Sequence, residues 1–76
     1  MTRYHCPFMR DVEADSADAA AAVFAARTAR RRWGTAGTSG PVWRTAEPDH
    51  YQAEVRGLKS RNVATVTLWV TERLPL

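Results

Sequence analysis

The 76-residue sequence contains a single cysteine, Cys6, and a single lysine, Lys59. One cysteine cannot form an internal disulfide, whereas small secreted scaffolds usually carry two or more, so we expect a reducing compartment. No hydrophobic run approaches the roughly 20 residues that span a bilayer, and no apolar segment follows the first residues as in a signal peptide. The expected localisation is therefore cytoplasmic, without a membrane partner.

Motifs for metal, cofactor and phosphate sites are also missing. One cysteine and two distant histidines cannot complete a four-ligand zinc site. The glycines between Gly34 and Gly40 follow a predicted helix instead of preceding one, so they do not form a phosphate-binding loop. Cys6 and His5 are neighbours on a predicted strand and point to opposite faces, so Cys6 is expected to be a small core residue rather than a nucleophile. We expect no cofactor, no metal and no catalytic residue.

The length of the chain favours binding over catalysis. We expect one small domain over residues 1–76. A domain of this size buries only roughly 60% of the surface that its unfolded chain exposes. Its thin core leaves little room for an enclosed substrate pocket, which usually needs roughly 300 Å³ or more. The expected function is that of a non-enzymatic binding module.

The hydrophobic pattern predicts an α+β fold in the order β-α-β-β-β. Alternating apolar and polar residues predict a first strand over 2–13, in which Pro7 marks an edge or a bulge. An alanine-rich helix is predicted after Asp15 or Ser16 as N-cap, ending before Gly34. A turn at 47–49 and a loop at 57–61 separate three further predicted strands, at 42–46, 50–56 and 62–71.

These elements are expected to form one helix packed on one face of a four-stranded, mainly antiparallel sheet. The segment 62–71 is apolar on both faces and is predicted to be a central strand. Two helix faces compete for the core, one ending at Trp33 and one containing Phe24. We expect the first to be buried, which leaves Phe24 at the rim or against a partner chain. The face expected to be buried consists of Ala19, Ala22, Val23, Ala26, Ala29 and Trp33.

Positive charge is concentrated in residues 27–46, which contain five arginines and no acid. If the strand 42–46 lies near the C-terminal end of the helix, these arginines form one patch that neutralises phosphates. The predicted nucleic-acid-binding residues are Arg27, Arg30, Arg31, Arg32 and Arg44, assisted by Lys59 and Arg61. The tryptophans could stack on unpaired bases, although packing is the commoner role for such residues. Cations at a helix C-terminus are also favoured without any ligand, so the patch alone does not establish this function.

Protein interaction is the alternative, as an adaptor or an inhibitor of a larger protein. A helix on one side of an open sheet leaves the other face bare, and exposed apolar patches usually mark contact surfaces. The predicted interface residues are Trp43, Val63 and Trp69, with Phe24. Dimerisation would cover this face, and small domains often gain stability in that way. The expected partner is thus nucleic acid, DNA or RNA, or a protein, including a second copy of the chain.

Overall fold

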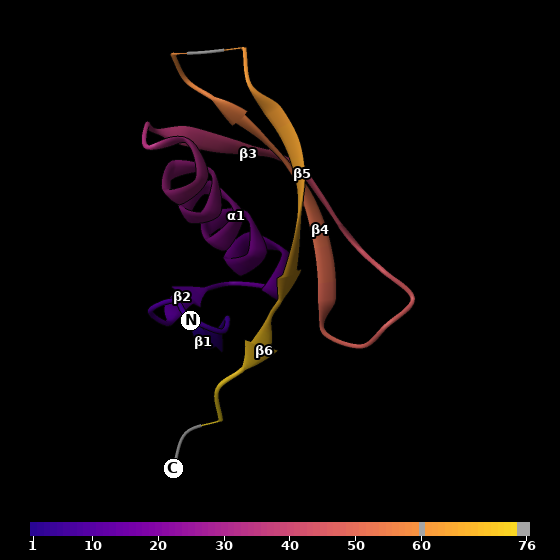
Figure 1. Ribbon diagram of the computed structural model, residues 1–76. Helices are drawn as coiled ribbons and strands as arrows, with labels where there is room; N and C mark the ends of the chain where they lie inside the picture. Colours follow the sequence, from indigo (N-terminus) through magenta and orange to yellow (C-terminus); the bar gives the residue numbers. More distant parts are fainter. Residues whose placement is uncertain (60, 75–76) are drawn as a thin grey trace.

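The computed structural model describes residues 1–59 and 61–74 and has the expected α+β class (Figure 1). Ser60, within the predicted loop 57–61, lies outside the described residues. The elements, in chain order, are β1 (Thr2–His5), β2 (Val12–Ala14), α1 (Ala17–Trp33), β3 (Gly37–Arg44), β4 (His50–Gly57), β5 (Val63–Trp69) and β6 (Thr71–Glu72). No helix in the described ranges has both the length and the apolar character needed to cross a membrane.

The strands form two three-stranded antiparallel sheets, so the prediction of one four-stranded sheet is wrong. Their strand orders are β2-β1-β6 and β3-β4-β5. The predicted single strand over 2–13 is instead a hairpin, in which Tyr4 of β1 pairs with Val12 of β2. The chain reverses between them, where the Met9 N–H donates a 3.2 Å hydrogen bond to the Cys6 carbonyl. Pro7 lies in this turn, where its missing N–H costs no ladder bond.

The central strand of the larger sheet is β4, so the prediction that 62–71 is central is also wrong. The predicted strand 50–56 corresponds to β4, and its alternating residues Tyr51, Ala53 and Val55 are buried. The chain leaves β5 at Val70 and continues as β6, which pairs with β1 (Figure 1). One predicted strand therefore contributes to both sheets.

The predicted strand 42–46 is part of a longer strand, β3, which begins five residues earlier and ends at Arg44. This strand begins at Gly37 and carries a register shift between Ser39 and Val42. Pro41 falls within that shift, where a residue without an N–H is tolerated in a sheet. Gly37 is required by close packing, because a Cβ at this position would lie 2.6 Å from the Cβ of Ala29.

The ends of α1 are as expected, but its buried face is not. The Ser16 Oγ accepts a 3.1 Å hydrogen bond from the Ala19 N–H, and Gly34 closes the helix at a φ of 70°. Phe24 is completely buried, whereas Val23 is 40% exposed and Trp33 is half-buried. The physical reason is how the helix is turned: α1 packs against strands of both sheets, and the side that faces them carries Phe24 and not Val23. The buried helix residues are Ala20, Ala21, Phe24, Ala25 and Ala29.

Candidate nucleic-acid interface

Three hollows on the surface differ in the charges that line them. One of about 580 Å³ is lined by Arg44 and by the acids Glu47, Asp49 and Glu72, with nine other residues. Another, of about 790 Å³, carries both signs, with Arg3 and Arg73 beside Asp11, Glu13 and Glu72. The third, of about 480 Å³, has no carboxylate in its lining, and we call it the arginine groove. It is formed by Phe8, Met9, Arg10, Arg27, Arg30 and Arg31.

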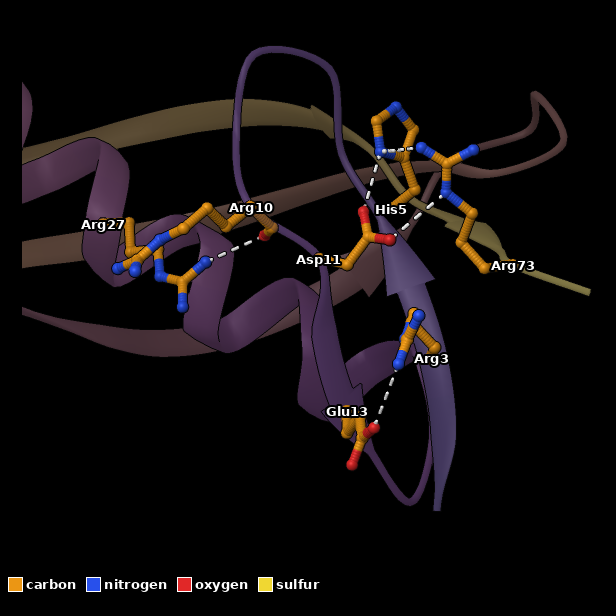
Figure 2. Close-up of polar contacts among 7 residues, drawn as sticks. All are labelled: Arg3, His5, Arg10, Asp11, Glu13, Arg27 and Arg73. Atoms are coloured by element: carbon orange, nitrogen blue, oxygen red, sulfur yellow. Dashed lines mark hydrogen bonds and ion pairs between the residues drawn. The ribbon is translucent and has the colours of Figure 1, made fainter. Parts of the chain in front are cut away.

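The arginine groove lies between α1 and the turn of the β1–β2 hairpin. Arg27, Arg30 and Arg31 are three and four residues apart, so their side chains emerge on the same side of the helix. The Arg27 Nη1 donates a 3.0 Å hydrogen bond to the Arg10 carbonyl oxygen, as Figure 2 shows. The Arg31 Nη2 lies 3.5 Å from the Phe8 carbonyl oxygen. These contacts hold the hairpin turn against the helix and bring Arg10 to the same groove.

The arginines of this groove differ in their partners from most of the arginines elsewhere. Four arginines outside the groove form ion pairs, namely Arg3 with Glu13, Arg44 with Asp18, Arg56 with Glu54 and Arg73 with Asp11. Within the described part of the chain, no carboxylate pairs with Arg10, Arg27, Arg30 or Arg31. Four like charges around one hollow repel each other, so a bound anion would lower their electrostatic energy.

The structure does not bring the predicted basic residues together as one patch. Arg44 lies beside the start of α1, with its Nε 3.8 Å from the Asp18 Oδ1. This is roughly 20 Å along the helix axis from Arg31, at 1.5 Å per residue. The reason is strand direction, since β3 starts beside Ala29 and runs back along the helix. Arg32 is rotated by about 100° from Arg31 and does not line the groove.

Lys59 and Arg61 lie in the loop between β4 and β5, at the end of the sheet near the helix C-terminus (Figure 1). The Leu58 N–H donates a 3.0 Å hydrogen bond to the Ala36 carbonyl, which ties this loop to the connection after α1. Neither residue lines the groove. They add positive charge at that end of the molecule but are not part of the arginine groove.

The sequence pattern does not indicate Arg10, Phe8 and Met9 as groove residues. The apolar and polar alternation of residues 2–13 resembles a strand, in which Arg10 would have no relation to the helix. The signal against a continuous strand is Pro7, which interrupts a ladder. It indicates a break in the strand, but not which element the resulting turn contacts.

The outer face of the β3-β4-β5 sheet carries the exposed tryptophans. Trp43 is 41% exposed, and its Nε1 donates a 2.9 Å hydrogen bond to the Gln52 Oε1. Trp69 is 46% exposed, with its ring centroid 4.3 Å from that of His50. Val63 is also exposed on this face. Phe24 cannot join this surface, because it is completely buried on the other side of the sheet, and its prediction as an interface residue is wrong.

The remaining ionisable clusters have structural explanations. The Asp11 carboxylate lies 3.1 Å from the His5 Nδ1 and 3.3 Å from the Arg73 Nε, which ties β1 to the segment after β6 (Figure 2). The hydrogen bond from His5, together with the Arg73 charge, lowers the pKa of Asp11. Burial raises the pKa of the Cys6 thiol, which makes it a weak nucleophile. Across residues 1–59 and 61–74, no three histidine, cysteine or acidic side chains are grouped to hold a metal ion.

Comparisons with known proteins found no match among protein-family models, curated proteins or solved structures.

Proposed function

We propose that this chain is a non-catalytic module that binds nucleic acid through the arginine groove. The observation that carries the proposal is the convergence of Arg10, Arg27, Arg30 and Arg31 on one hollow without a lining carboxylate. Among the described residues, four of the six arginines outside the groove pair with an acid, whereas none of the four groove arginines does, so positive charge is concentrated there.

The geometry suits phosphate groups spaced along a backbone. A guanidinium group donates paired hydrogen bonds that match phosphate oxygens, which makes arginine a favoured residue for this contact. Side chains three and four residues apart on a helix start roughly 5–6 Å from each other, so they can reach neighbouring phosphates of one strand. Arg32, Lys59 and Arg61 would add long-range attraction from the same end of the molecule.

Salt dependence of binding tests this proposal. Fluorescence anisotropy with labelled oligonucleotides measures the dissociation constant as the salt concentration rises. Four phosphate contacts predict a slope of about −2.8 for the logarithm of the association constant against the logarithm of the salt concentration with a single strand, and about −3.6 with a duplex. The single-strand slope corresponds to roughly 50-fold weaker binding between about 50 and 200 mM salt. Binding that does not change with salt, or no binding at low salt, would refute the proposal.

A matched control separates the groove from general surface charge. Arg56 pairs with Glu54 on the outer sheet face, away from the groove. Arg56→Ala removes the same charge as Arg30→Ala but leaves the groove intact. The proposal requires Arg30→Ala to weaken binding and Arg56→Ala to leave it nearly unchanged.

Protein contact through the outer sheet face is a second candidate function. The observation that favours it is that Trp43 and Trp69 are both exposed and each is held in place by a neighbour on β4. Oriented aromatic side chains of this kind are frequent hot spots of protein interfaces.

The simplest such protein contact is self-association of the chain, which sedimentation equilibrium measures directly. Trp69→Ala should abolish a dimer, whereas Thr67→Ala on the same face should weaken it less. A wild-type chain that stays monomeric at high concentration would exclude self-association.

A further inference from the structure

Phe8 is an exposed aromatic residue at the edge of the arginine groove. Its side chain is 94% exposed, so it contributes nothing to the core. Its backbone has a φ of 67°, a left-handed conformation that bulky residues rarely adopt. The turn closed by Cys6 and Met9 accounts for the positive φ, but glycine or asparagine would adopt it with less strain, so folding does not explain a solvated phenylalanine here. Strained residues of this kind are typical of functional sites.

The conformation of Phe8 is held by contacts on both sides. The Met9 N–H donates to the Cys6 carbonyl at 3.2 Å, and Cys6 is anchored in the core. On the other side, the Arg27 guanidinium holds the Arg10 carbonyl at 3.0 Å. The hairpin turn is thus fixed against α1, and Phe8 lines the groove with the arginines.

We infer that the arginine groove binds single-stranded nucleic acid, with an unpaired base stacked on the ring of Phe8. This inference rests on the proposed function and specifies its ligand. Grooves for single strands combine positive side chains along the backbone with aromatic side chains on which bases stack. A duplex keeps its bases paired and stacked inside, so Phe8 would find no free base face without opening it.

The experiment compares a labelled single strand, as DNA and as RNA, with a duplex of the same sequence. Anisotropy titrations at one salt concentration should show that the wild-type chain prefers single strands. Phe8→Ala should weaken single-strand binding by roughly 5- to 150-fold, the range expected for loss of one stacked base, with little effect on the duplex. Phe8→Tyr should retain binding, and Phe8→Leu should not, because a leucine has no aromatic face.

Phe8→Gly serves as a control for stability, and Arg30→Ala as a control for binding in the groove. Phe8→Gly relieves the left-handed backbone, so its melting temperature should equal or exceed that of the wild type while its single-strand affinity falls. If Phe8→Ala and Phe8→Gly bind single strands as the wild type does, the inference is wrong, even when Arg30→Ala weakens binding and the proposed function stands. A wild-type preference for the duplex also overturns the inference. If no oligonucleotide binds, both the inference and the proposed function fall.

Discussion

The Arg27 guanidinium donates a 3.0 Å hydrogen bond to the carbonyl oxygen of Arg10, which joins the helix to the hairpin turn. The contact brings together two arginines that are 17 positions apart in the sequence. It therefore has two roles, because it fixes the turn against the helix and also assembles the positive groove.

Arg27→Ala should affect both stability and binding. Loss of one hydrogen bond to a charged donor predicts a decrease of roughly 1 kcal/mol in the free energy of unfolding, since the site is partly solvated. Urea denaturation measures this decrease. Oligonucleotide affinity should fall further than in Arg30→Ala, because the released turn also carries Arg10 and Phe8 out of position. Equal affinity losses in the two variants would show that the turn does not depend on Arg27.

The two competing helix faces give a sharp stability prediction. Phe24→Ala should cost about 3–5 kcal/mol, because it leaves a large cavity where the two sheets meet the helix. This is a large part of the stability of a small domain, so circular dichroism should show a largely unfolded or strongly destabilised chain. Val23→Ala, at an exposed neighbour, should change stability by no more than about 0.5 kcal/mol. A larger loss of stability in Val23→Ala than in Phe24→Ala would mean that the helix packs through its other face.

The cluster of His5, Asp11 and Arg73 predicts a dependence of stability on acid pH. The pKa of Asp11 is lower in the folded chain than its ordinary value of 3.8, mainly because His5 donates a hydrogen bond to its carboxylate. A lowered folded pKa gives stability that is present above the unfolded pKa and is lost as the pH falls through the folded one. The stability difference between the wild type and Asp11→Asn should therefore shrink below about pH 4. A difference that stays constant down to pH 2 would contradict this account.

Local signals in the sequence predicted the parts of the fold that depend on near neighbours. Ser16 and Gly34 mark the helix ends, because capping involves atoms only three or four residues away. The alternation of apolar and polar residues along β4 indicates which of its side chains point into the core, because one face of that strand is buried. The helix face is different, since the stripes of Val23 and Phe24 are similarly apolar and only the packing of α1 against the strands decides between them.

The candidate site depended on tertiary contacts and was therefore predicted only in part. The spacing of Arg27, Arg30 and Arg31 on one helix side follows from helix geometry alone. The addition of Arg10 depends on a hairpin that the alternation of residues 2–13 obscured. The separation of Arg44 follows from the direction of β3, which local patterns do not specify.

The affinities of Arg31→Ala and Arg32→Ala for a labelled single-stranded oligonucleotide distinguish binding in the arginine groove from binding by general surface charge. The two residues are adjacent, exposed and equally charged, and both occupy the last turn of α1, but only Arg31 lines the groove. We expect Arg31→Ala to bind about tenfold more weakly, with a salt slope shallower by about 0.7, and Arg32→Ala to change affinity less than about twofold. Equal losses in the two variants would contradict the account, because they would show that binding depends on total charge and not on the groove.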